Sequence, residues 1–241
     1  MKTAYFLGIP AFALLSAAGL NIDSCNKPKS NSATDCNTSS WTNYVYIEDI
    51  PGDKNFYTLP EKIFIGGGHA ELEQRFTNYY RYWTGIELAI PCDKKIAAEN
   101  TRLEWYCKSN LSIGMYESDM GASLSGEKDT ASINCITVNR PPYFLFRYGD
   151  IKLNNVPELV NDPSEWAVYA IEISEKGMSF SKNGVVKKSI PGKKTLGNLQ
   201  KIYLHFKGGG RIDWVKLYEH NKLIMEDNFD KPGQSSIHWI K

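Results

Sequence analysis

The stretch that decides the fold runs from Glu165 to Glu219. It holds three segments of alternating polarity: EWAVYAIEISEKGMSFSKNG (165–184), LQKIYLHFKGGG (199–210) and RIDWVKLYE (211–219). A period of two predicts β-strands that bury one face. Asn183-Gly184 is the strongest short hairpin signal a sequence carries, because both residues tolerate positive φ. This stretch of the chain therefore predicts an antiparallel sheet with a tight turn at Asn183-Gly184.

The rest of the chain from Trp41 onward shows the same kind of organisation. Short β-like runs alternate with turn signals, and long helical periods are nearly absent. The predicted runs are 43–47, 62–65, 71–90 (a strand pair or one bent strand), 102–108, 111–117, 132–138, 143–148, 166–174, 177–181, 185–190, 201–206, 212–218 and 223–225. We expect 102–108 and 111–117 to pair as a hairpin about Ser109-Asn110. So many short strands in one chain predict two packed antiparallel sheets.

The closing strands resemble a known family. The aromatic strand at 166–174, the hairpin at Asn183-Gly184 and the strand Asp213-Trp214-Val215-Lys216-Leu217-Tyr218 are similar to the end of concanavalin A-like jelly rolls. The similarity is to family-sixteen glycoside hydrolases and their laminin-G-like relatives. The resemblance implies an all-β jelly-roll sandwich and a glycan partner.

The same resemblance implies a place for catalysis. Family members carry Glu-x-Asp-x-Glu on a strand upstream of the aromatic strand, which sets three carboxylates on one sheet face. The nearest match here is Glu117-Ser118-Asp119, and Gly121 stands where the third carboxylate would be. We therefore interpret this segment as a strand end rather than a catalytic strand, and expect no catalytic residues of the family type.

Charge excludes one class of partner. The 28 Lys and Arg nearly balance the 27 Asp and Glu, which gives a net charge of +1. Without a basic stripe, nucleic acid is not an expected partner. Aromatic residues make up 12% of the chain, which suits a sheet core and also suits a sugar-binding surface.

The N-terminus predicts export. Lys2 precedes the apolar run Ala4–Leu20, so we interpret residues 1–24 as a signal peptide, with a retained signal anchor as the alternative. Ser24-Cys25-Asn26 resembles the lipoprotein signal of Bacteroidetes, which implies a lipid on Cys25 and attachment to the outer membrane. Residues 25–40 are polar and predict a flexible tether, followed by the folded domain at 41–241.

The cysteine count is odd, at five. If Cys25 carries a lipid, four remain for an oxidising compartment. Either Cys92 pairs with Cys107 or Cys135 and leaves Cys36 in the tether, or Cys107 and Cys135 are small apolar core groups. Neither Cys-x-x-Cys nor a histidine cluster is present, so zinc is not expected.

Candidate sugar-binding residues begin on the predicted strand 102–108. Glu104, Tyr106 and Lys108 share one face, opposite Leu103, Trp105 and Cys107. A carboxylate, a phenol and an ammonium on the concave face of a jelly roll suit sugar hydroxyls, and the expected hairpin would add Tyr116. The alternative is an ordinary solvated face with cross-strand pairs.

Two more candidates come from aromatic strands. Trp83 ends the run Tyr79–Trp83, one face of which could stack on sugar rings while the other joins the core. Arg147 stands alone in an aromatic strand, either contacting ligand or pairing with a carboxylate such as Asp150 or Glu104.

Asp213 is the candidate metal ligand. In bacterial members of the resembling family, an Asp in this Asp-Trp-Val-Lys context helps to bind a structural calcium with backbone carbonyls. Calcium prefers such oxygen ligands. The alternative interpretation is a capped strand end.

Three functions remain open from the sequence. The favoured one is an exported, lipid-anchored module that binds a poly- or oligosaccharide without catalysis. The second is a glycoside hydrolase or polysaccharide lyase with a different catalytic constellation. The third is a surface domain for protein interaction, which would expose an apolar patch.

Overall fold

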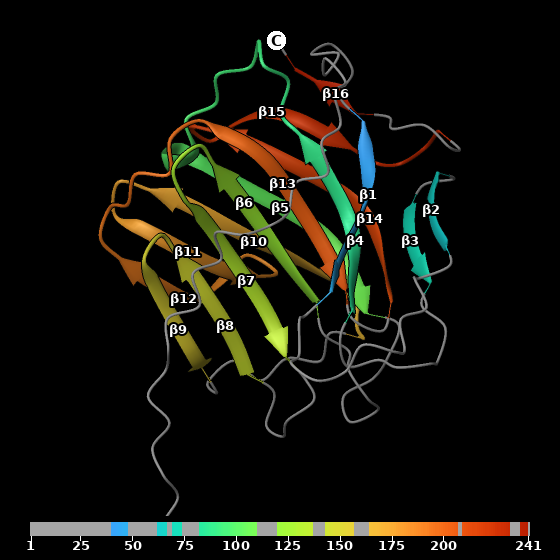
Figure 1. The fold of residues 1–241 in the computed structure, drawn as a ribbon, viewed down its shortest axis with the longest axis horizontal. Helices are drawn as coiled ribbons and strands as arrows, with labels where there is room; N and C mark the ends of the chain where they lie inside the picture. The colour runs from blue at the N-terminus through green and yellow to red at the C-terminus, as the bar shows by residue number, and fades with distance from the viewer. Residues whose placement is uncertain are drawn as a thin grey trace, which may run out of the picture. The chain divides into compact units, whose positions relative to one another are not determined.

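Two antiparallel sheets packed face to face form the described part of the chain (Figure 1). The computed structural model describes residues 40–47, 62–66, 69–73, 82–109, 120–136, 143–156, 164–206, 209–231 and 237–240. All of them belong to one compact unit, Asp35–Lys241. The predicted all-β jelly-roll sandwich is confirmed.

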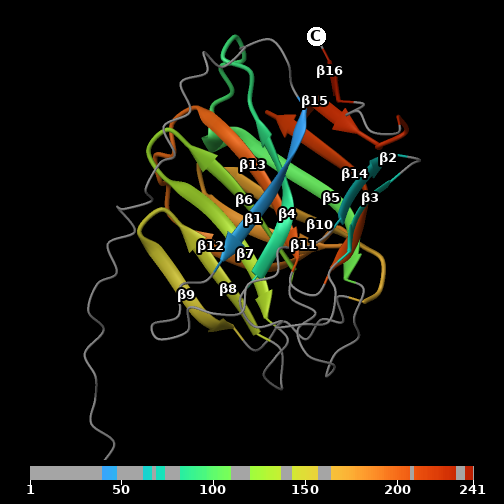
Figure 2. The same cartoon turned by 45° about the vertical axis from the view of Figure 1, so that its right-hand side comes forward.

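The seven-stranded sheet has the order β1-β4-β13-β6-β7-β8-β9, and the nine-stranded sheet has the order β12-β11-β10-β5-β14-β15-β16, with β3 on β14 and β2 on β3 (Figures 1 and 2). The strands are β1 (Trp41–Ile47), β2 (Lys62–Gly66), β3 (His69–Glu73), β4 (Tyr82–Ala89), β5 (Thr101–Ser109), β6 (Met120–Gly126), β7 (Thr130–Ile136), β8 (Tyr143–Tyr148), β9 (Ile151–Val156), β10 (Ala167–Ser174), β11 (Gly177–Lys182), β12 (Val185–Pro191), β13 (Leu199–Phe206), β14 (Gly210–Glu219), β15 (Lys222–Asp227) and β16 (His238–Trp239).

The core lies between the sheets and follows the alternation in the sequence. In β5 every second residue is buried, including Leu103, Trp105 and Cys107. Trp105 stacks on Tyr169 of β10 with ring centroids 5.9 Å apart. Across the sandwich, Phe144 of β8 meets Phe180 of β11 at 5.3 Å. Such ring pairs add to the hydrophobic energy of burial.

Two cysteines belong to this core. Cys107 on β5 and Cys135 on β7 are completely buried, whereas Cys92 is exposed. Burial raises the pKa of the Cys107 thiol far above its ordinary value. This arrangement favours the alternative in which Cys107 and Cys135 act as small apolar groups.

The hairpin at Asn183-Gly184 is confirmed between β11 and β12. Both turn residues have positive φ, 51° and 76°, as a primed two-residue turn requires. The side chain of Asn183 also accepts a hydrogen bond from the backbone of Val168 at 2.9 Å, so the turn is fixed to β10 as well.

Two predicted pairings are wrong. β5 lies between β10 and β14, which hydrogen-bond to its two edges. No edge is left for a hairpin with 111–117, and those residues lie outside the described part of the chain. The run 71–90 is not one strand pair either, because β3 joins the nine-stranded sheet and β4 joins the seven-stranded sheet.

Strand β1 is connected to the opposite sheet through a buried carboxylate. The indole of Trp41 donates to Asp227 at 2.9 Å, and the backbone N–H of Phe229 donates to the other oxygen at 2.8 Å. Trp41, Asp227 and Phe229 are all buried. The beginning and the end of the described domain are therefore held together by one polar cluster.

Helical structure is limited in the described ranges to a short 3-10 turn, η2 (Ala98–Asn100). Nowhere in those ranges is there a helix with the length and apolar character to span a membrane.

Candidate functional site

A continuous polar row crosses the outer face of the seven-stranded sheet. Strand register places one residue from each strand side by side: Thr42, Glu87, Tyr203, Ser123, Ser132, Arg147 and Lys152. A parallel row beside it contains Gly85, His205, Gly121 and Asn134. Small residues in the middle strands leave a low floor between larger polar groups. We name these two rows the polar floor.

His205 is a buried side chain of the polar floor. The neighbouring residues Leu204 and Phe206 face the core, so alternation points His205 outward, yet only 8% of it is exposed. Its Nε2 lies 2.8 Å from Oδ1 of Asn134, two strands away. The ring reaches across Gly121, where an added Cβ would lie 2.4 Å from Nε2 and 2.1 Å from the Asn134 oxygen. Only glycine leaves room for this contact.

Burial also sets the protonation of His205. Desolvation lowers its pKa to about 3 from an ordinary value of 6.5. The imidazole is therefore neutral at physiological pH, and Nε2 facing an amide oxygen carries the proton and donates it. A neutral, anchored imidazole suits hydrogen bonding better than acid catalysis at neutral pH.

Next to His205, a carboxylate, an ammonium and a phenol meet on β4 and β13. Lys201 Nζ lies 3.4 Å from Glu87, which also accepts a hydrogen bond from Thr42 at 3.4 Å. Burial, and then the Glu87 carboxylate, raise the pKa of Tyr203. Tyr203 is therefore a protonated hydrogen-bonding group at neutral pH rather than a base.

Arg147 lies at the far side of the polar floor, on β8. Its guanidinium pairs with Asp129 at 3.0 Å and also contacts the carbonyl oxygen of Gly149 at 3.4 Å. Pairing with a carboxylate was one of the two predicted roles, but the partner is Asp129 rather than Asp150 or Glu104. The pair leaves 40% of the arginine side chain exposed beside Ser132.

The predicted residues of β5 lie on the outer face of the other sheet. Glu104, Tyr106 and Lys108 share that face, as the alternation predicted. Glu104 contacts Arg102 at 3.3 Å. Tyr106 lies between Trp166 and Trp214, with centroids 4.9 and 5.9 Å apart. Each of these side chains thus has cross-strand or neighbouring partners.

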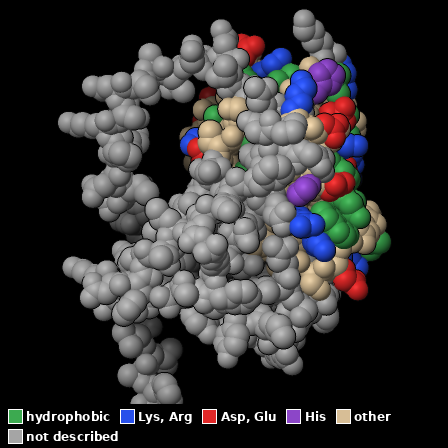
Figure 3. Space-filling model, turned by 90° about the vertical axis from the view of Figure 1, so that its right-hand side faces the viewer, with side chains coloured by type: hydrophobic (Ala, Val, Ile, Leu, Met, Phe, Trp, Pro, Cys, Tyr) green, Lys and Arg blue, Asp and Glu red, His purple; other side chains and the backbone are tan. Residues whose placement is uncertain are grey.

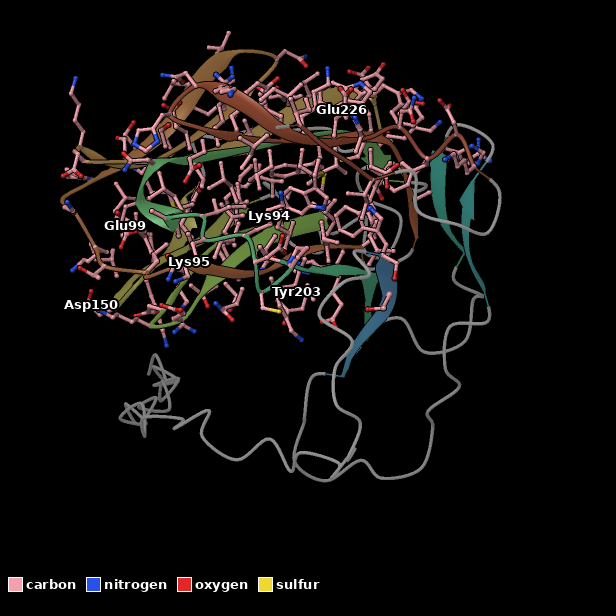
Figure 4. The ribbon with its side chains drawn as sticks, turned by 90° about the horizontal axis from the view of Figure 1, so that it is seen from above. Lys94, Lys95, Glu99, Asp150, Tyr203 and Glu226 are labelled. Carbon is pink, nitrogen blue, oxygen red and sulfur yellow. The ribbon has the colours of Figure 1, made fainter. Side chains whose placement is uncertain are left out.

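The sequence-predicted set does not assemble into one surface. Arg147 and the strand of Trp83 belong to the seven-stranded sheet, and the residues of β5 belong to the nine-stranded sheet. Figure 4 shows the two outer faces on opposite sides, with Tyr203 labelled on one and Glu226 on the other. Tyr116 and Cys25 lie outside the described residues, and of Trp83 only the backbone is described.

Asp213 occupies a β-bulge in β14, between Ile212 and Trp214. Within the described ranges, no three His, Cys, Asp or Glu side chains are grouped closely enough to hold a metal ion. A calcium ion there would depend on one carboxylate and backbone carbonyls, which is a poorer fit than a multi-carboxylate cage. The calcium therefore stays a prediction.

Sequence reasoning missed the polar floor. Lys201-x-Tyr203-x-His205 and Ser132-x-Asn134 show the period of two that marks one sheet face. This period could have predicted which residues share a face within each strand. The contact between His205 and Asn134, however, joins residues 71 positions apart. Only the strand order brings them together.

Comparison with known proteins agrees with this architecture. No protein-family model and no curated protein matches the chain. Among solved structures, one from a study of endo-acting O-glycanases that members of the human gut microbiota express to initiate mucin breakdown is 13% identical, with 75% of this chain and 92% of that chain covered and a TM-score of 0.50.

Two further structures are similar at lower scores. A β-glucanase of Bacillus licheniformis is 12% identical over 74% of this chain and 92% of its own, with a TM-score of 0.42. The Caenorhabditis elegans galectin LEC-6 is 9% identical over 53% of this chain and 89% of its own, with a TM-score of 0.36. At such identities the likeness concerns the fold alone, and it is the first structure that supports the jelly roll.

Proposed function

We propose that this protein binds a poly- or oligosaccharide on the polar floor of the seven-stranded sheet, and that it does so without catalysis. The observation that carries the proposal is the low solvent exposure of polar side chains that point away from the core. His205 is 8% exposed although it points away from the core, and the adjacent Tyr203 is half-buried. A polar outer face withdrawn from water is typical of the floor of a ligand cleft.

The chemistry of the polar floor suits sugar hydroxyls. Hydroxyl groups are both donors and acceptors, and the floor offers both kinds of partner. Ser123, Ser132 and Tyr203 provide hydroxyls, and Glu87 provides a carboxylate. The fold agrees, since the similar protein at a TM-score of 0.50 comes from work on O-glycanases that act on mucin.

The spacing of the two paired carboxylates in the described part of this face differs from that of the usual hydrolytic pair, and Glu117 and Asp119 lie outside the described residues. Glycoside hydrolysis by the usual route needs two carboxyl groups within about 10 Å. On the described part of this face, Glu87 of β4 and Asp129 beside β7 are three strand positions apart, or about 14 Å at the usual strand spacing. Both are also paired with a cation.

The proposal includes export and a membrane anchor. Cleavage before Cys25 and lipidation of its thiol would place the domain on the outer membrane at the end of the tether 25–40. The evidence for this is the N-terminal sequence alone. Mass spectrometry of the membrane fraction would show the lipid on Cys25, and a soluble Cys25→Ala variant would support the assignment.

Affinity gels test the function itself. The purified protein is run through native gels that each contain one polysaccharide or mucin, and the same gels are then stained for cleared zones. We expect retarded migration in at least one gel and no clearing. Clearing would show an enzyme, and unretarded migration in every gel would favour the protein-interaction alternative.

A further inference from the structure

A hollow lies on the opposite sheet, over β14, β15 and β16. Its volume is about 430 Å³, and its lining is Trp214, Lys216, Glu226, Asp227, Asn228 and His238. A space of this size falls within the range of small-ligand sites. Since the outer faces of the two sheets point in opposite directions (Figure 4), this hollow is separate from the polar floor.

A row of polar side chains, Lys216, Glu226 and His238, crosses the base of the hollow. Register pairs Glu104 with Lys216, Lys216 with Glu226, and Glu226 with His238 across four neighbouring strands. Lys216 therefore lies between two carboxylate residues. An anionic ligand would meet Glu226 and a cationic ligand would meet Lys216, so the row favours a neutral ligand that both donates and accepts hydrogen bonds.

An aromatic ring forms the wall of the hollow. Trp214 stacks on Tyr106 with ring centroids 5.9 Å apart, and Tyr106 packs against Trp166 in a tilted arrangement at 4.9 Å. The ammonium of Lys216 lies 4.9 Å from the Trp214 ring centroid. Tyr106 and Lys216 thus restrict the motion of the Trp214 indole, which reduces the entropy that a ligand must remove on binding.

The surrounding surface shows no dominant charge. In the described part of the side shown in Figure 3, acidic, basic and histidine side chains are interleaved with apolar ones. The described part of that side therefore presents no field of one sign to a strongly charged partner. The ligand class is therefore argued from the side chains that line the hollow.

We infer that the hollow bounded by Trp214, Lys216, Glu226 and His238 is a second saccharide site, specific for a neutral mono- or disaccharide unit. This inference rests on the proposed glycan function and adds a site to it. The indole offers a surface for sugar C–H groups, and Glu226, Lys216 and Asn228 offer partners for hydroxyls. With sites on opposite faces, one protein could hold two segments of a glycan and gain avidity.

The test follows the indole N–H resonance of Trp214 by NMR in the full chain. Lactose, cellobiose and laminaribiose are the neutral probes, and glucuronic acid is the anionic comparison. We expect a saturable shift with at least one neutral disaccharide. Glu226→Ala should weaken the binding at least tenfold. Glu172→Ala, a carboxylate change on the same face outside the hollow, should leave it unchanged.

The outcomes separate this inference from the proposed function. If a glycan retards the wild type in gels but the Trp214 signal stays constant with every neutral probe, the second site is wrong and the proposed glycan-binding function stands. A shift with glucuronic acid alone would overturn the ligand class. If the protein binds no glycan in any gel and the Trp214 signal is constant, both proposals fail.

Discussion

At the scale of single residues, His205 shows how the polar floor is built. A histidine on an outward position is withdrawn from water because glycines at 85 and 121 leave space around it. Its ring donates to Asn134 at 2.8 Å. The contact fixes both side chains, so the donors and acceptors beside it are pre-positioned for a ligand.

The buried histidine predicts a pH-dependent stability. In the unfolded chain its pKa is near 6.5, and in the fold it is about 3. Between these values the unfolded state binds a proton that the folded state excludes, so stability falls as the pH drops from about 6.5 toward 3. At pH 4.5 the loss is about 3 kcal/mol. Urea unfolding of wild type and His205→Gln at pH 7 and 4.5 measures it.

The His205→Gln variant is the control, because it keeps every other titrating group and lacks only the imidazole. His205→Gln should lose less stability on acidification than the wild type, by about the same 3 kcal/mol. Equal losses in the two proteins would mean that His205 is not a buried neutral group in solution.

At the scale of elements, the β11–β12 hairpin is the part most fully encoded by local sequence. Asn183-Gly184 predicts a turn with two positive φ values, and the structure has them. A side chain at residue 184 would meet nothing within 4 Å, so any penalty there comes from the backbone. Turn chemistry alone therefore decides what this position tolerates.

We predict that Gly184→Ala lowers the free energy of unfolding by about 1–2 kcal/mol, because an L-residue in the left-handed region is strained. Lys187→Ala, an exposed change in the same hairpin, should alter it by less than about 0.5 kcal/mol. Chemical denaturation of both variants provides the measurement. A Gly184→Ala protein as stable as the wild type would contradict the turn geometry.

Elements paired over long distances could not be predicted in the same way. The strand β5 was readable from alternation, yet its partners β10 and β14 follow it in the chain by some sixty and a hundred positions. The expected hairpin with 111–117 failed because local adjacency was the only available guide. The same limit applied to the candidate site. Alternation predicted that Glu104 and Tyr106 share a face, but it could not predict that the candidate sugar-binding residues lie on two different sheets.

At the scale of the whole molecule, the cluster of Trp41, Asp227 and Phe229 connects the two sheets. Asp227 is almost completely buried and accepts from both neighbours. A buried carboxylate is tolerated only when such donors satisfy it. This cluster holds β1, at one edge of the seven-stranded sheet, to β15 of the other sheet.

Removing the carboxylate should destabilise the sandwich. Asp227→Ala leaves the Trp41 indole N–H and the Phe229 amide without this acceptor, at a cost of about 2–3 kcal/mol in unfolding free energy. Glu175→Ala, which removes an exposed ion pair with Lys193, should cost less than about 1 kcal/mol. Thermal unfolding distinguishes the two. Equal melting temperatures would show that the cluster contributes little.

The central claim is that a glycan lies on the polar floor of the seven-stranded sheet. Ser132 lies in the middle of that floor, between Ser123 and Arg147, and Ser179 on β11 is a similarly half-exposed serine on the other sheet. Leucine at either position projects outward, so the two changes are matched in chemistry and differ in face.

The decisive measurement is the retardation of Ser132→Leu and Ser179→Leu in the gel that retards the wild type. We predict that Ser132→Leu loses at least tenfold in affinity for that glycan, because its side chain fills the low floor, while Ser179→Leu migrates like the wild type. Unchanged retardation of Ser132→Leu, or equal loss in both variants, would contradict the placement of the glycan on this face.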